Sequence, residues 1–332
     1  MTDEEGEGRM SSKWTDRGLP RYRDLPIDPS QPPRSAWGVF GRDDQVGTVN
    51  LLTADRVAAA ARLVTKGAVF PLNWNIELPD PPLLRREALR HHIVELNPGT
   101  DDYYDNYYTQ GSTQWDALCH MPHPEFGYYN GVQRPDITGR PGSKNGIDNW
   151  ARRGIVGRFV LADVERAMAA EGRPIDNSER VPVTADMIEA TLAREGVAVE
   201  TGDILLIRCG WIAWYEQRTV AERNAMAKAG IEIRTPGLDA DDRTLEFLWD
   251  HGVAAVAADV PGLEALPYTP TPDGFLHYNV IPLLGIAVGE MFALNDLAAD
   301  CADDGIYVGL FAAAPLNKIG GSGSPGNALA LK

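Results

Sequence analysis

The sequence predicts an α/β fold, because segments typical of helices and of buried strands alternate in its second half. Residues 184–195 are amphipathic, with Thr184 at the N-cap position and acidic residues early, which is typical of a helix. The apolar run 202–209 predicts a buried strand, residues 239–250 a second helix, and residues 253–258 a second buried strand. This order of elements favours a sheet covered by helices.

The first half supplies fewer regular elements. Thr53 precedes an alanine-rich run and Gly67 follows it, so a helix is expected over 53–64. Residues 68–78 carry Val, Phe, Trp and Ile and predict a strand that ends at the turn 79–82. Four tyrosines lie in residues 101–108, either as strand residues with hydroxyls toward solvent or as an aromatic wall facing a ligand.

Composition narrows the class of partner. The chain has 31 Lys and Arg against 47 Asp and Glu, a formal charge of −16, which opposes nucleic acid and anionic membranes and favours a small-molecule partner. Its three cysteines are an odd number and far apart, which is typical of a reducing cytoplasm. Residues 1–36 are rich in acidic residues and proline and predict a mobile N-terminal arm, and no apolar stretch is long enough to cross a bilayer.

The most distinctive stretch is residues 110–120, which gathers amide, carboxylate and imidazole groups and contains no lysine or arginine. In an extended segment Gln110, Gln114 and Asp116 share one face, and His120 can rejoin it after a turn. Such groups are costly to bury unless they bind one another, water, a metal or a substrate. The pattern alone leaves open a polar core strand with a structural histidine and a functional site.

This stretch resembles the metal-binding signature of the cyclase family, which includes bacterial kynurenine formamidase and isatin hydrolase. In that signature, His-x-Gly-Thr-His-x-Asp-x-Pro-x-His, the two leading histidines correspond to Gln110 and Gln114, whereas Asp116 and His120 match. The resemblance extends over residues 37–325, through segments at 72–74, 81–83, 154–158, 202–206, 258–259, 277, 290 and 320–325. It implies one large domain of swivelling β/β/α architecture over these residues, with a C-terminal tail at 326–332, in a divergent branch of the family.

The resemblance also implies a divalent metal ion held by Asp116, His277 and Glu290, with His120 as the catalytic acid and base. Two carboxylates would offset the charge of the ion, and the imidazole would be the third ligand. An amide oxygen is a harder and weaker donor than imidazole, so Gln110 and Gln114 should lower the affinity for zinc. We therefore expect one ion, with manganese or magnesium tolerated better than zinc, or an empty first metal position.

Residues around the stretch are candidates for contact with a substrate. The expected substrate-binding group is Gln110, Gln114, Trp115, His123 and Tyr128. The aromatic members suit a flat cyclic substrate, although core packing explains them nearly as well, and His123 is also a candidate second ligand or proton carrier. Nothing around Cys119 is typical of an activated thiolate, so a nucleophilic role is disfavoured. Asp259 and Glu264 could orient metal ligands, but the sequence favours capping of the loop after the second strand.

Three functions remain open. The leading hypothesis is a metal-dependent hydrolase that cleaves or opens an amide, lactam or lactone of a small cyclic or aromatic substrate, with His120 moving the proton. The alternative enzyme is a metal-independent cyclase, dehydratase or isomerase in which Gln110 and Gln114 hold a substrate carbonyl. The third is a non-catalytic small-molecule binding protein. Family resemblance also implies a homo-oligomer.

Overall fold

A nine-stranded sheet forms the centre of the computed structural model, which describes residues 18–332. Its strand order is β1-β13-β11-β5-β7-β9-β10-β4-β12. The parallel centre consists of β5 (Ile155–Ala162), β7 (Ile204–Ile207), β9 (Ala255–Ala258) and β10 (Ala287–Glu290). The remaining strands pair antiparallel and are β1 (Val69–Pro71), β4 (Gln114–Asp116), β11 (Val308–Ala313), β12 (Gly323–Pro325) and β13 (Ala328–Leu331).

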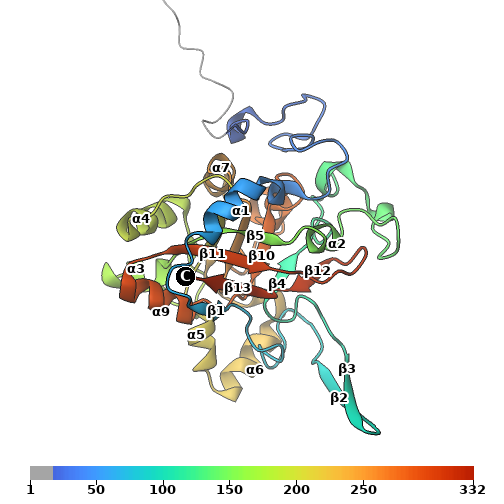
Figure 1. The fold of residues 1–332 in the computed structure, drawn as a ribbon, viewed down its shortest axis with the longest axis vertical. Coiled ribbons are helices and arrows are strands. Elements are labelled where there is room, and N and C mark those ends of the chain that lie inside the picture. Colours follow the sequence, from blue (N-terminus) through green and yellow to red (C-terminus); the bar gives the residue numbers. More distant parts are fainter. Residues whose placement is uncertain (1–17) are drawn as a thin grey trace, which may run out of the picture.

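Helices lie on both sides of this sheet (Figure 1), which confirms the prediction of a single large α/β domain. They are α1 (Ala54–Ala61), α2 (Asp148–Ala151), α3 (Val164–Ala170), α4 (Ala185–Glu195), α5 (Trp211–Glu216), α6 (Val220–Ala229), α7 (Asp242–Asp250), α8 (His277–Val280) and α9 (Asn295–Asp304). A short parallel pair, β6 (Pro182–Val183) and β8 (Gly237–Leu238), lies outside the main sheet. Within residues 18–332 we find no helix long and apolar enough to cross a membrane.

The predicted helices are present and begin at their caps. Thr184 accepts a hydrogen bond from the backbone of Met187 at the start of α4, and Gly196 ends that helix with φ 71°. The helix expected over 239–250 begins only after Asp241, because this residue is the N-cap and accepts from the backbone of Thr244. The short buried strands β7 and β9 also lie where the apolar runs predicted them.

The strand expected over 68–78 is shorter than predicted. Only Val69–Pro71 forms a strand, and beyond Pro71 the backbone makes single contacts, such as those of Leu72 with Ala328 and Ala293. Asn73 makes one isolated bridge with Phe292, and the backbone N–H of Trp74 donates to Thr113 Oγ1 at 2.7 Å. The side chain of Thr113 therefore accepts the hydrogen bond that a neighbouring strand would accept if the predicted strand continued through Trp74.

Both predicted terminal segments are wrong where the structure describes them. Residues 20–22 pack on α7: Tyr22 is buried and its hydroxyl donates to Asp242 at 2.9 Å, and Trp249 Nε1 donates to the carbonyl of Pro20 at 2.7 Å. The rest of the predicted mobile arm, residues 1–17, lies outside the described residues. The predicted tail 326–332 instead contains β13, which lies between β1 and β11 in the sheet. Both segments bury apolar side chains that periodicity could not assign to a partner.

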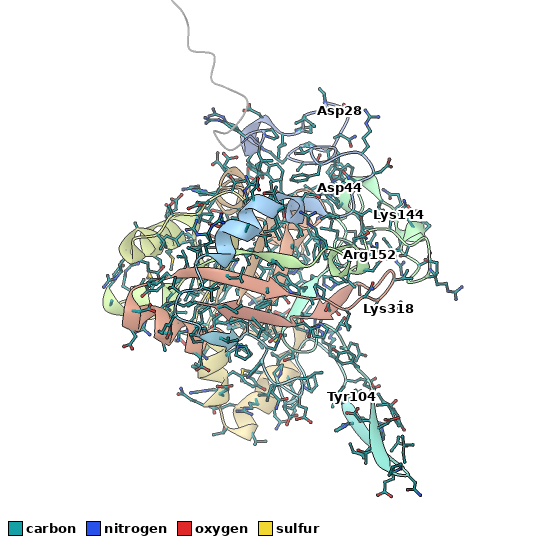
Figure 2. All side chains as sticks on the ribbon, in the orientation of Figure 1. Asp28, Asp44, Tyr104, Lys144, Arg152 and Lys318 are labelled. Carbon is teal, nitrogen blue, oxygen red and sulfur yellow. The ribbon has the colours of Figure 1, made fainter. Side chains whose placement is uncertain are left out.

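A two-stranded hairpin, β2 (Arg90–Leu96) and β3 (Gly99–Asp105), extends away from the body (Figure 1). Tyr103 stacks on His92 and Tyr104 stacks on His91 across the strands, and both tyrosines are exposed. Tyr104 lies near the end of this hairpin that joins the body (Figure 2). Of the two interpretations of the tyrosine-rich stretch, these two residues follow the first, as strand residues facing solvent.

Candidate metal centre

The centre forms where β4 and β10 pair antiparallel. The register places Gln114 opposite Glu290, and Asp116 lies two residues further along the same face of β4. Gln114 Nε2 donates to Glu290 Oε2 at 2.6 Å and to Asp116 Oδ2 at 3.4 Å. On the other side of β4, Gly323 of β12 faces Asp116, and a Cβ there would lie 2.2 Å from the Gln110 amide. The glycine-rich run 320–325 thus leaves room for Gln110.

His277, the first residue of α8, completes a buried group. Its Nε2 lies 3.2 Å from Glu290 Oε1 and 3.8 Å from Asp116 Oδ2. One potential ligand atom from each of Asp116, His277 and Glu290 lies within 4.8 Å of the others, and all three residues are buried. These residues, distant in sequence, could therefore hold a metal ion.

Glu264 orients His277, whereas Asp259 has a different role. Glu264 Oε2 accepts from His277 Nδ1 at 2.7 Å, which directs Nε2 toward the other two carboxylates. A carboxylate behind a metal-binding imidazole fixes its orientation in this way. Asp259 accepts from the backbone N–H groups of Cys209 and Gly210 and caps the turn after β7. Asp259 therefore does cap a turn, but the turn after β7 and not the expected loop after β9. The capping expectation is wrong for Glu264, whose contact with a residue 13 positions away has no local sequence signal.

His120 lies at the edge of this group and is its most accessible member, with 22% of its side chain exposed. Its Nε2 is 3.6 Å from Asp116 Oδ1, and its Nδ1 is 3.5 Å from Gln110 Nε2. Gln110 Nε2 is also 3.4 Å from Asp116 Oδ1, so the amide links the histidine to the carboxylate. The structure therefore brings Gln110, Gln114, Asp116 and His120 together, as the sequence predicted.

Charge and an unpaired oxygen fit a cation at this centre. Asp116, Glu264 and Glu290 surround one imidazole, so the group keeps a negative charge even when His277 is protonated. Buried excess charge is costly unless a cation or a proton neutralises it. The Oε1 atom of Gln114 is buried without a hydrogen-bond partner in the described chain, and rotation of the amide would present it to the same space. The donor set of oxygens and one imidazole suits a divalent ion.

The pKa values show how the group responds without such an ion. Burial, and then Asp116, raises the pKa of Glu290 to about 7. Burial opposes protonation of His277, but Glu264, Asp116 and Glu290 together raise its pKa well above the usual value. Burial lowers the pKa of His120, and Asp116 only partly offsets this effect. His120 is therefore the neutral imidazole of the pair, whereas His277 is the cationic one.

Three residues expected near a substrate lie apart from the buried group. Trp115 points to the opposite face of β4, where it is fully buried, packs edge-on against Phe292 at 5.0 Å and donates to the carbonyl of Gly326. The core interpretation thus replaces the substrate-binding one for Trp115. Tyr128 is also buried, in a turn where its backbone donates to Val132.

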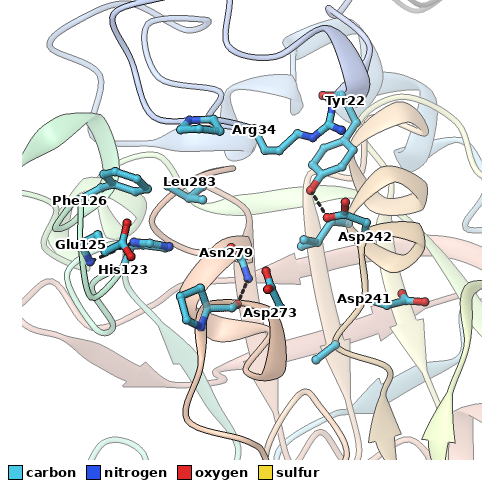
Figure 3. Close-up of a pocket in the computed structure, with 14 residues that line it drawn as sticks. Tyr22, Arg34, His123, Glu125, Phe126, Asp241, Asp242, Asp273, Asn279 and Leu283 are labelled. Carbon is cyan, nitrogen blue, oxygen red and sulfur yellow. Dashed lines mark hydrogen bonds between the residues drawn. The ribbon is translucent and has the colours of Figure 1, made fainter.

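His123 lines a separate cavity of about 670 Å³ (Figure 3). Its ring stacks on Phe126 at 4.5 Å, and its Nδ1 accepts from the backbone of Glu125. The structure therefore does not bring His123 into the metal-binding group, although contact with a substrate in this cavity stays a prediction. Asp273 and Asn279, which flank His277 in the chain, line the same cavity.

Cys119 does not have the environment of a nucleophile. It is buried, its Sγ donates to the carbonyl of Gly321 at 3.5 Å, and burial raises the pKa of the thiol to about 12. A thiolate is therefore scarce near neutrality. All three cysteines are free and buried.

Comparison with known proteins agrees with this geometry. A family model described as "Putative cyclase" matches residues 52–265. The chain belongs to the cyclase family. A crystal structure described as a novel cyclase is 32% identical with a TM-score of 0.79, covering 90% of this chain and 97% of that one.

Other solved structures share the fold at lower identity. Isatin hydrolase A from Labrenzia aggregata bound to benzyl benzoate has a TM-score of 0.58 at 18% identity, covering 86% of this chain and 98% of that one. Isatin hydrolase A from Ralstonia solanacearum has a TM-score of 0.57 at 19% identity, covering 84% and 97%. No curated protein matches the chain.

Proposed function

We propose that this cyclase-family protein is a metal-dependent hydrolase that cleaves or opens an amide, lactam or lactone bond in a small cyclic or aromatic substrate. The observation that carries the proposal is the buried arrangement of three carboxylates around His277 beside a neutral His120. The fold shared with isatin hydrolases supports the same reaction class.

In this proposal Asp116, His277 and Glu290 hold one divalent ion. The ion supplies Lewis-acid chemistry for a carbonyl group and for water. We favour manganese or magnesium over zinc, because two of the three ligands are carboxylates, whose oxygens are hard donors. Gln114 stays bonded to both carboxylates and holds them in place.

His120 moves the proton. Its contact with Gln110 at 3.5 Å is at the limit of a hydrogen bond, so the lone pair on Nδ1 is available to take a proton from water. Asp116 faces Nε2 and stabilises the imidazolium that results, and His120 then delivers the proton to the leaving nitrogen or oxygen. Gln110 orients His120 and contacts the substrate in this proposal.

One observation favours the alternative of a metal-independent cyclase, dehydratase or isomerase. His277 has a raised pKa and is itself a cation between Asp116 and Glu290. In that case Gln110 and Gln114 would hold a substrate carbonyl and His120 would move the proton. Loss of catalysis with retention of ligand binding is the third outcome.

Metal content and turnover separate these functions. Protein purified without chelators should contain about one divalent ion per chain by mass spectrometry of the metals, and chelation should abolish hydrolysis of formanilides, lactams or lactones. Turnover that persists in metal-free protein would support the alternative enzyme. Binding of small aromatic ligands without turnover across such a panel would support the binding protein. Two ions held by this group would contradict the argument from Gln110 and Gln114.

We also propose a homo-oligomer in the cytoplasm. The β2–β3 hairpin exposes Ile93, Leu96 and Tyr103 (61%, 52% and 51%), and an isolated two-stranded hairpin is marginal in water, so a second copy would stabilise it. Ile93→Asp with Leu96→Asp should reduce the mass measured by light scattering, whereas Val220→Asp, at an exposed helix start, should not. The free cysteines support a reducing compartment.

A further inference from the structure

Arg86 lies close to the candidate centre and has no role in the mechanism above. It is partly buried, in the segment before β2, and it is within electrostatic reach of Asp116, Glu290 and His120. It also lines a cavity of about 30 Å³, which has room for a small group such as a carboxylate. The cavity is also lined by Tyr107, Tyr108 and Gly111, the last of which is adjacent to Gln110, and by the exposed residues Glu77 and Glu87.

The guanidinium of Arg86 forms no hydrogen bond or ion pair within residues 18–332. Arg208 shows what this chain does with a buried structural arginine: its side chain binds Asp163 at 2.7 Å, Glu165 at 2.9 Å and Asn295 at 3.0 Å. A guanidinium carries five N–H donors in a fixed planar arrangement, and burying them without hydrogen-bond acceptors costs free energy. Burial lowers the pKa of Arg86, and Glu290 and Asp116 only partly oppose this effect.

We propose that Arg86 is a specificity residue that binds a carboxylate group at the entrance of the site. The planar guanidinium matches a carboxylate with two parallel hydrogen bonds. The cavity is too small for a ring, so only the charged group of a substrate would enter it. The inference rests on the proposed hydrolase and adds a substrate class, a carbonyl compound with an anionic substituent.

The carboxylate that binds Arg86 could come from either of two molecules. It could be a substituent of the substrate, or it could be the carboxylate of a product that hydrolysis creates. Hydrolysis of 2-formamidobenzoate, for example, adds water across the formyl C–N bond and releases formate and 2-aminobenzoate, with one proton passing to solvent. Formanilide gives formate and aniline by the same step and lacks the ring carboxylate.

Binding is measured first, by calorimetry on metal-free protein, so that the result does not depend on turnover. Arg86→Gln should weaken benzoate about ten- to a hundredfold and leave the neutral isostere benzamide unchanged. Arg86→Lys should restore part of the affinity, because a lysine keeps the charge without the fork. Arg85→Gln is the matched control, because Arg85 is the adjacent, exposed arginine.

Kinetics then separates the two sources in the metal-loaded protein. If the substrate carries the carboxylate, Arg86→Gln raises KM for 2-formamidobenzoate and not for formanilide, with kcat little changed. If only the product is bound, KM is unchanged and inhibition by formate weakens.

The proposal is overturned if benzoate and benzamide respond equally to Arg86→Gln, or if the variant changes only metal affinity, since Arg86 would then merely balance Asp116 and Glu290. Failure of the hydrolase proposal would give a different result. The unmodified protein would then hydrolyse neither formanilide nor 2-formamidobenzoate, whereas the difference in benzoate binding between the unmodified protein and Arg86→Gln would remain.

Discussion

Two buried carboxylate clusters in this protein are neutralised in different ways. In the structural cluster, Asp163 and Glu165 bind the fixed positive charge of Arg208, and Asp163 also caps α3 through the backbone of Arg166. In the candidate centre, Asp116, Glu264 and Glu290 surround His277, whose charge depends on a proton. The first cluster is complete within the chain, and the second has more negative charge than its imidazole can offset.

The difference separates a structural role from a functional one. An arginine cannot lose its proton, so the cluster around Arg208 needs no further ligand. A histidine can lose its proton to admit a metal ion, and the surrounding carboxylates then bind that ion.

Asp116→Asn should reduce metal affinity by about a thousandfold, because it removes one of the two anionic ligands. It also removes excess negative charge, so the metal-free protein should be at least as stable as the unmodified one. Metal content after dialysis and the midpoint of urea unfolding test both parts. A variant that keeps its ion would place the metal elsewhere.

Arg208→Met should have the opposite pattern. It removes the cation shared by the buried Asp163 and the half-buried Glu165, although Arg166 still pairs with Asp163 at 3.0 Å, so the free energy of unfolding should fall by about 3 kcal/mol. The folded fraction should still bind one metal ion. Urea unfolding with metal analysis of the folded protein measures both quantities, and an unchanged midpoint would mean that the cluster relaxes into water.

His120→Asn should lower kcat by about a hundredfold or more with metal content and folding retained, because it removes proton transfer but no ligand. Steady-state rates and metal content are compared on the same preparation. Loss of the ion, or full activity, would contradict the proposed role of His120.

Gln114→His should raise zinc affinity by about tenfold, because it places an imidazole opposite Glu290 and next to Asp116. Competition with a chromogenic chelator measures the change, and Gln133→His at the surface is the control. Equal zinc affinity in a folded variant would mean that residue 114 does not face the ion.

Glu195 lies beside the structural cluster, where it accepts from the backbone of Asp163, and burial followed by Asp163 raises its pKa to about 8. Because an unfolded glutamate has a pKa of about 4.3, the folded state binds more protons between about pH 4.3 and 8. Stability should therefore fall as pH rises through this window, by less than about 1.4 kcal/mol per pH unit because the group is partly solvated.

Glu195→Gln should remove this slope and stabilise the protein above pH 7. Urea unfolding at several pH values measures it, with Glu95→Gln on the exposed hairpin as the control. A slope that persists in Glu195→Gln would assign the titration to another group.

The sequence by itself determined the elements whose causes are local. The side chains of Thr184 and Asp241 cap α4 and α7 by accepting from backbone N–H groups three residues later, and the runs in β7 and β9 are apolar enough to be buried on both faces. The spacing of Gln114 and Asp116 also determined that they share one face of a strand. Family resemblance supplied His277 and Glu290, which no spacing could have joined to them.

Only the tertiary structure decided which polar groups meet. Glu264, in the loop after β9, contacts His277. Arg86, in the segment before the β2–β3 hairpin, lies close to Asp116 and Glu290. Trp115 faces the core because β4 pairs with β10 and β12. The two terminal segments likewise entered the domain because α7 offered a partner to the first, and β1 and β11 offered partners to the second. Local sequence sets conformation and the alternation of faces, whereas burial, charge balance and pKa depend on neighbours that only the folded chain brings together.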